Sequence, residues 1–171
     1  MTKKGNAGRF DVPVRSAGEA VQGSIVGMGK CKFYRISHYT LMPPFFMTLT
    51  GAGDHWMFIS SNGALTAGRR DPSNALFPYT TDDKITDSAG NTGSLTVFRI
   101  GERGKEVLWE PFSSESHRTF AIQRNLYKSI YGNILIFEEI NYTLNLVFSY
   151  SWQFSSDAGF VRTSRIRNFS S

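Results

Sequence analysis

The stretch from Ser60 to Asp87 holds the densest group of side chains that could do chemistry. It contains two adjacent arginines, four aspartates, a lysine and an aromatic–proline step, all set among turn-forming residues. It has no period of two or 3.6, so we expect a long connection rather than a strand or helix. Such connections in compact sheet proteins are functional or disordered. An ordered one is favoured here by the apolar residues Leu65, Leu76, Phe77, Tyr79 and Ile85.

The acidic part of this stretch consists of Asp82, Asp83 and Asp87, with Lys84 between them. Paired carboxylates do acid/base work in glycoside cleavage, where one carries a proton and the other is ionised. Neighbouring aspartates on a turn, however, usually diverge into solvent. The preceding pair of threonines also resembles a helix N-cap or Asx-turn sequence. A structural turn, a binding role and an interface role therefore all remain open.

The basic part is Arg69-Arg70, followed by Asp71 and a proline. It is either a salt-bridged turn or a planar donor fork for a carboxylate, a phosphate or a pair of sugar hydroxyls. Trp56 and Tyr79 add aromatic faces that could stack on a sugar ring, although large aromatics more often fill β-sheet cores. The candidate ligand or interface residues are therefore Trp56, Arg69, Arg70, Tyr79, Asp82, Asp83 and Lys84.

Other catalytic patterns are absent from the sequence. The histidines His38, His55 and His117 are far apart and show no metal-ligand spacing, and there is no Gly-x-Ser-x-Gly elbow. We therefore predict no metal, no cofactor and no catalytic residue in this chain. Cys31 is the one cysteine, and its alternating surroundings predict a small buried hydrophobe.

The net charge of +5 invites a nucleic-acid partner, but the basic residues are scattered and no nucleic-acid-binding motif is present. We therefore expect no nucleic acid. No apolar run reaches membrane-spanning length, and residues 1–8 lack the apolar core of a secretory signal. The sequence thus predicts no membrane contact and a cytoplasmic location.

The clearest predicted strand is Leu144 to Phe154, where all six even positions are large and apolar. Successive strand side chains point to opposite faces, so these six share one side. Turn signals every eight to twelve residues predict an all-β, antiparallel sandwich or barrel, and of the two we expect the sandwich. Further strands are expected at 45–50, 56–60, 95–100, 106–109, 117–123, 134–140 and 160–166, with strand or loop at 125–131.

The domain organisation follows from the same pattern. Residues 21–171 are long enough for one β-sandwich domain with its own core. Residues 1–20 lack periodicity and are predicted to be a flexible lead-in. Within the lead-in, Phe10, Val12 and Val14 could form a short edge strand.

Two phrases, SNGALTAGR at 61–69 and ALFPYTTDDKI at 75–85, give the chain a family resemblance. With FEEIN at 137–141 and GFVRT at 159–163, the chain from residue 28 onward resembles the amino-terminal part of cellobiose-phosphorylase-like proteins. Those proteins begin with a galactose-mutarotase-like β super-sandwich, and an (α/α)6 catalytic barrel follows. The family's sandwich is larger, so this chain is expected to be either a small stand-alone domain or a shortened or incomplete copy.

The resemblance implies a supporting role in a carbohydrate-active protein of the glycoside phosphorylase or hydrolase type. The family's general acid lies in the barrel, so no catalytic residue carries over to this chain. The family's sandwich packs on the barrel, lends loops to the sugar cleft and takes part in dimer contacts, and residues 62–87 would be such a loop. The partners expected are carbohydrate, an (α/α)6 domain or a second copy.

Two alternatives stay open beside this hypothesis. One is a free-standing sugar-binding module. The other is a mutarotase-like sugar epimerase, which needs an acid and a base on opposite sides of the sugar ring. Only the three histidines could supply that chemistry together with a carboxylate.

Overall fold

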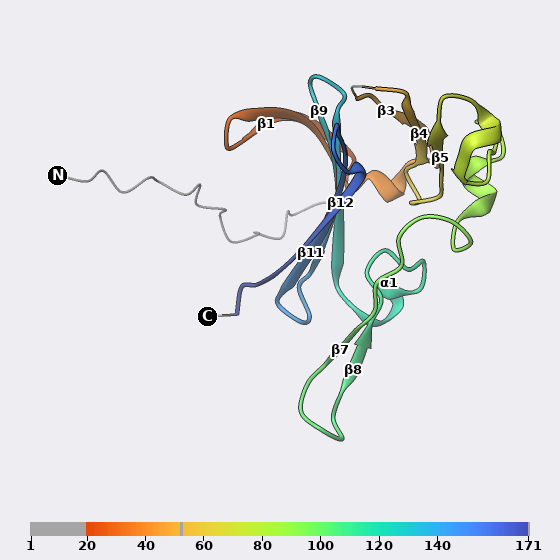
Figure 1. Cartoon of the computed structure of the whole chain (residues 1–171). Helices are drawn as coiled ribbons and strands as arrows, with labels where there is room; N and C mark the ends of the chain where they lie inside the picture. Colours follow the sequence, from red (N-terminus) through yellow and green to blue (C-terminus); the bar gives the residue numbers. More distant parts are fainter. Residues whose placement is uncertain (1–19, 52, 171) are drawn as a thin grey trace.

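The computed structural model describes residues 20–51 and 53–170, and this part of the chain forms three antiparallel sheets (Figure 1). The six-stranded sheet has the order β1 (Gln22–Met28), β2 (Cys31–Ser37), β9 (Ile122–Ser129), β10 (Ile134–Asn141), β11 (Leu146–Ser155) and β12 (Gly159–Asn168). The four-stranded sheet contains β3 (Phe46–Leu49), β4 (His55–Ser60), β5 (Leu65–Arg69) and β6 (Ala75–Phe77). β7 (Phe98–Ile100) and β8 (Val107–Trp109) pair by themselves.

Helical turns are short and lie in the connections. They are the 3-10 turns Tyr39–Leu41, Pro72–Asn74 and Ile85–Ser88, and the helix α1 (Ser116–Thr119). In the described residues, no helix combines the length and the apolar character needed to cross a membrane. The prediction of an all-β antiparallel sandwich is confirmed.

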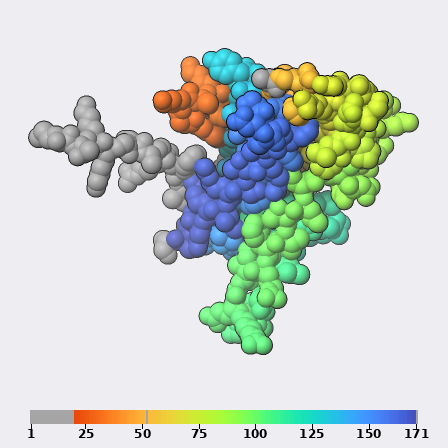
Figure 2. Space-filling model, in the orientation of Figure 1, coloured from red at the N-terminus to blue at the C-terminus, as the bar shows by residue number. Residues whose placement is uncertain are grey.

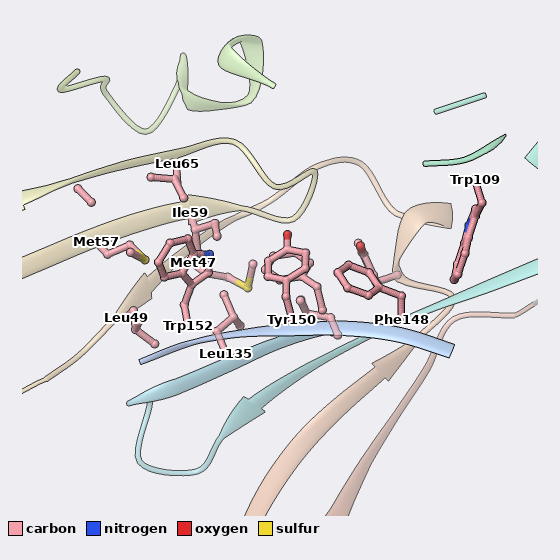
Figure 3. Packing of buried hydrophobic residues seen from close by; sticks show 14 of the residues in the cluster. Met47, Leu49, Met57, Ile59, Leu65, Trp109, Leu135, Phe148, Tyr150 and Trp152 are labelled. Atoms are coloured by element: carbon pink, nitrogen blue, oxygen red, sulfur yellow. The ribbon is translucent and has the colours of Figure 1, made fainter. Parts of the chain in front are cut away.

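The core lies between the six-stranded and four-stranded sheets (Figure 3). Leu146, Phe148, Tyr150 and Trp152 of β11 all belong to it, which confirms the predicted alternation. Figure 3 shows Phe148, Tyr150 and Trp152 rising from one strand toward Met57, Ile59 and Leu65 on the opposite sheet. The strand begins at Leu146 because the preceding Asn145 has a left-handed φ of 53°, which belongs to the turn.

Several of the expected strands pair with the next strand along the chain. β3 pairs with β4, β7 with β8, β10 with β11, and β11 with β12, each antiparallel. β10 lies between β9 and β11 inside the six-stranded sheet, so its apolar residues on both faces fit a central position. Residues 125–131, left open as strand or loop, form most of β9 and the turn after it.

The prediction of one long connection from Ser60 to Asp87 is wrong. The segment contributes β5 and β6 to the four-stranded sheet, with β5 between β4 and β6. Alternation is missing from β5 because its first four residues are buried on both faces, and the middle three, Thr66 to Gly68, are small. At Gly68 the space is especially tight, since a Cβ there would lie 2.5 Å from Cζ2 of Trp56.

Two smaller predictions are also wrong. The expected strand at 117–123 is instead α1 followed by the start of β9, and the Phe120 amide bonds to the Ser116 carbonyl. Local i→i+4 bonding overrides the apparent alternation there. Cys31 is exposed rather than buried, because it stands at the first position of β2, directly after a hairpin turn. The lead-in, including the edge strand expected around Phe10, lies outside the described residues except for residue 20.

Candidate functional site

A cavity of about 650 Å³ opens beside the core and is the main candidate site. Its walls are the loops 61–63, 89–95 and 110–114. Side chains of Tyr39, Phe137 and Tyr150 reach it from the 3-10 turn, β10 and β11. A volume of this size lies within the usual range for small-molecule sites.

The first two walls hold each other in place through local hydrogen bonds. Asn62 donates from Nδ2 to the Thr86 carbonyl at 3.0 Å, and the hydroxyl of Thr92 accepts from the Leu65 amide at 3.1 Å. Gly63 and Gly93 both have positive φ, and a Cβ at Gly93 would collide with the Gly63 carbonyl oxygen. The two loops therefore need glycine where their backbones meet.

The third wall is fixed by a buried carboxylate. Glu139 accepts at Oε1 from Trp109 Nε1 (2.8 Å), and at Oε2 from the Phe112 amide (2.7 Å) and Arg124 Nε (2.7 Å). Arg124 also donates from Nη2 to the Ser113 carbonyl at 2.6 Å. The Glu139 side chain is 0% exposed and that of Arg124 is 11% exposed, so the ion pair is desolvated and neutralises its own charge.

The aromatic floor is closely packed. Tyr150 stacks on Phe137 with ring centroids 4.9 Å apart, and the guanidinium of Arg162 lies 4.8 Å from the Tyr150 centroid. β10 and β12 flank β11 on opposite sides, so these two groups cover both faces of the ring. Phe112 adds an edge contact at 5.3 Å. Tyr150 can therefore offer the cavity its hydroxyl but not its ring face.

Two tyrosine hydroxyls supply the floor with polar atoms. Burial raises the pKa of Tyr150 and of Tyr39 well above the ordinary value of 10.0. Both hydroxyls therefore stay protonated at neutral pH, where each can donate one hydrogen bond and accept others. The Tyr150 hydroxyl lies close to the wall, since a Cβ at Gly63 would be 3.5 Å from it.

The cavity lining favours binding of an uncharged polar ligand. Its walls carry hydroxyl and amide side chains such as Thr40, Asn62, Asn91 and Ser113, and Arg124 is already paired. Among the described lining residues Glu110 is the one carboxylate, and it is exposed. A paired acid and base of the kind that glycoside cleavage needs is not present in this lining.

The residues predicted from sequence lie elsewhere. None of Trp56, Arg69, Arg70, Tyr79, Asp82, Asp83 and Lys84 lines the cavity. The structure brings Trp56 and Tyr79 together, with ring centroids 5.9 Å apart in an edge contact. Trp56 is half-buried, and its indole Nε1 is buried without a hydrogen-bond partner.

The charged candidates are at the surface. Arg70 donates to Asp54 at 3.4 Å, which supports the interpretation of a salt-bridged turn. Asp82, Asp83 and Lys84 are exposed on the turn that leads into the 3-10 helix Ile85–Ser88. The side chain of Asp71 caps the 3-10 turn Pro72–Asn74 by accepting from the Ser73 amide at 2.9 Å. Hydrogen bonding with the Ser73 side chain, and then with the Ser73 amide, lowers the pKa of Asp71.

The three histidines are also separate from the cavity. His55 lies on β4 between Phe154 and Phe160, with ring centroids 5.9 and 5.2 Å away. His117 lies in α1, and His38 precedes the first 3-10 turn with a left-handed φ of 54°. None lines the cavity.

The cavity residues were not predicted from the sequence because their spacing is the same as that of ordinary core residues. Tyr150 is one of six large side chains in a regular alternation, and nothing in that pattern separates it from Phe148. A signal existed at Glu138-Glu139, two charged residues inside a strand that is apolar up to that point. A buried carboxylate requires a cation or hydrogen-bond donors beside it. Arg124, which pairs with Glu139 on the neighbouring strand, is that cation.

A scan of protein-family models and a search of curated proteins each found no match to this chain. The functional argument therefore depends on the geometry of the site and on the sequence resemblance.

Proposed function

We propose that this chain is a carbohydrate-binding β-sandwich domain, without catalysis of its own, that holds part of a neutral saccharide in the cavity. The observation that carries the proposal is the lining. Two protonated tyrosine hydroxyls and a set of uncharged hydroxyl and amide groups surround an aromatic floor. A saccharide has the same alternation of hydroxyls and apolar ring faces, and each hydroxyl can both donate and accept.

The electrostatics support a neutral rather than an ionic ligand. The charge of Arg124 is compensated by Glu139, and its Nε and one Nη already have partners. A ligand carboxylate or phosphate would have to compete with a desolvated carboxylate at 2.7 Å. A ligand with neutral hydroxyls can bind without displacing Glu139 from Arg124.

The test is a titration of the chain with a panel of neutral mono- and trisaccharides, followed by amide chemical shifts. We expect shifts in loops 61–63, 89–95 and 110–114. Tyr150→Phe removes only one oxygen atom and should weaken binding by roughly fivefold, since a neutral hydrogen bond contributes about 1 kcal/mol. Tyr34→Phe, on the exposed hairpin β1–β2, is the matched control and should bind as the wild type does. A flat titration across the panel would reject the proposal.

A second candidate function, protein docking, is favoured by the hairpin β7–β8. It projects from the sandwich in Figure 2, at the lower end of the green surface. Leu108 on β8 is 67% exposed, and Leu95 and Val97, in the segment just before β7, are 74% and 53% exposed. Exposed apolar groups gathered in this way mark interaction surfaces.

The occupant we propose for this hairpin is a second copy of the chain. Sedimentation velocity should show a dimer for the wild type and a monomer for Leu108→Lys. Leu76→Lys, at a similarly exposed leucine on β6, is the control and should remain dimeric. A wild type that stays monomeric across the concentration range contradicts dimer docking.

A further inference from the structure

The six-stranded sheet has a second face, directed away from the cavity and the core, and its central rows are almost entirely polar. The strand register places one side chain from every strand in a single row: Gln22, Ser37, Asn125, Glu138, Ser149 and Arg165. The adjacent row on the same face is Ser24, Arg35, Tyr127, Ile136, Ser151 and Thr163. We call these two rows the polar face.

The polar face is buried at its centre and exposed at its ends. Ser37, Asn125 and Tyr127 are only 5%, 2% and 6% exposed, whereas Gln22 and Arg165 at the two ends are exposed. Burying hydroxyls, an amide and a carboxylate costs free energy unless they are hydrogen-bonded. A purely structural sheet face would more often place apolar side chains at such positions.

Glu138 is held firmly but keeps one oxygen available. Tyr127 donates to its Oε1 at 2.6 Å and Asn125 donates to the same atom at 2.8 Å, while Oε2 receives neither bond. Asn125 is itself fixed by Gln123 at 3.0 Å. Because the carboxylate is oriented before any ligand arrives, Oε2 is a preorganised acceptor for a hydroxyl.

Beside this carboxylate, two buried polar atoms have no hydrogen-bond partner. They are Nε of Arg35 and Oγ of Ser24, and the two residues are directly opposite each other in the β1–β2 register. A buried donor on a guanidinium that lacks an acceptor is costly. A ligand bearing a charged acceptor would satisfy Arg35 and could also bond to the neighbouring hydroxyl.

The charges on this face specify the ligand further. Arg35 and Arg165 belong to the polar face, and Arg167 follows Arg165 on the same side of β12. Glu138 is the one carboxylate that the described strands place there, so the two rows carry two arginines against one glutamate, a net charge of +1, and Arg167 adds a positive charge in the next row. The arginines could therefore bind an anionic group of a ligand. The neighbouring hydroxyls, the amide and the Glu138 oxygen could bind the hydroxyls of the same ligand.

We propose that the polar face binds an acidic saccharide of the uronate class, with the sugar carboxylate on Arg35 and ring hydroxyls on Glu138 and the neighbouring serines. This site is separate from the cavity, because residues of opposite strand parity point to opposite sides of the sheet. It therefore does not depend on the function proposed for the cavity.

The test is calorimetric titration at low ionic strength with trigalacturonic acid, with the neutral galactotriose as the matched ligand. We expect the wild type to bind the acidic trisaccharide at least about tenfold more tightly, because charge-assisted hydrogen bonds are the stronger ones. Arg35→Gln should remove this preference, and Glu138→Gln should weaken binding severalfold. Arg99→Gln, on the separate hairpin, is the control and should leave binding unchanged.

The remaining outcomes are also decisive. If Arg35→Gln does not fold, Arg165→Gln at the exposed end should still weaken binding of the acidic ligand by about threefold. Tyr150→Phe should leave that binding unchanged, which separates this site from the cavity. Equal binding of the two trisaccharides, no binding of either ligand to this face, or equally tight binding of inorganic phosphate would overturn the proposal.

Discussion

Glu138 and Glu139 are neighbours in sequence and have opposite environments. Successive side chains of β10 point to opposite faces of the sheet, so Glu139 enters the core side and Glu138 the polar face. Glu139 is fully buried and both of its oxygens accept hydrogen bonds. Glu138 is half-buried, and both of its donors reach the same oxygen. Glu139 therefore has a structural role, whereas Glu138 keeps one carboxylate oxygen that can accept a hydrogen bond from a ligand.

The two residues are of the same type, so residue type does not separate a structural residue from a binding residue. What differs is whether every carboxylate oxygen already accepts a hydrogen bond within the protein. Glu139 joins β8, β9, β10 and the loop at 110–114, because its donors come from Trp109, Arg124 and Phe112. Glu138 joins only strands of its own sheet, through Tyr127 and Asn125 of β9. Removing the first should disturb the fold, whereas removing the second should mainly disturb binding.

The largest expected effect is that of Glu139→Ala. This change leaves the Arg124 guanidinium desolvated and unpaired, so we expect a loss of about 3–5 kcal/mol in the free energy of unfolding. Urea titration followed by circular dichroism measures it. Glu138→Ala is the matched control and should cost only about 1 kcal/mol, because its carboxylate is half-buried. Equal losses for the two variants would remove the distinction between them.

A finer test removes one donor from each carboxylate. Trp109→Phe takes away the Nε1 donor to Glu139 and also some buried volume, so it should cost about 2–3 kcal/mol. Tyr127→Phe takes away one donor to Glu138 and should cost about 1 kcal/mol, because Asn125 still donates to the same oxygen. Thermal unfolding of the two variants compares them. A larger loss for Tyr127→Phe would show that the polar face is the more structural of the two.

Much of the fold could be predicted from the sequence because period two is a local signal. The even-numbered apolar residues from Leu146 to Trp152 identified both the strand and its buried face. The turn residues around Asn141 and Gly159 located the hairpins on either side of it. Where both faces are buried, as in β5, small residues replace the alternation and the strand could not be seen.

The candidate sites were harder to predict because they depend on register between strands distant in sequence. The cavity joins Tyr39 to Tyr150 and to loops at 61–63 and 89–95, and no local spacing reveals that arrangement. The polar face is visible only once Ser37 is known to pair with Asn125, and Asn125 with Glu138. Charged residues close in sequence, such as Asp82 and Asp83, attracted attention but lie exposed on a turn.

The pH dependence of stability extends the comparison to the tyrosines that line each face. Burial raises the pKa of Tyr39, Tyr150 and Tyr127 above the ordinary value of 10.0. Below pH 10 these tyrosines are protonated in both the folded and the unfolded chain, so their full contribution to the free energy of unfolding is present. Above pH 10, the unfolded chain loses protons that the folded chain keeps, so stability falls by up to about 1.4 kcal/mol per pH unit for each tyrosine.

Urea titrations between pH 9 and 11 measure this slope. Tyr150→Phe should make the slope shallower by about 1.4 kcal/mol per pH unit, and Tyr127→Phe should act similarly. Tyr131→Phe is the control, because that side chain is 77% exposed and its substitution should leave the slope unchanged. A slope that none of the buried tyrosines alters would show that other groups control alkaline unfolding.

The smallest effect is expected at Arg70, whose exposed ion pair contrasts with the buried pair of Arg124 and Glu139. Arg70 and Asp54 are 3.4 Å apart with side chains 69% and 53% exposed, so solvent screens the pair to well under 1 kcal/mol. Arg70 also has a φ of 67°, a conformation that glycine adopts without strain. Arg70→Gly should therefore change stability by less than about 0.5 kcal/mol, whereas Arg70→Ala keeps the strain and loses the pair. A loss above 2 kcal/mol for the glycine variant, measured by urea titration, would mean that this surface turn supports the fold as strongly as a buried contact does.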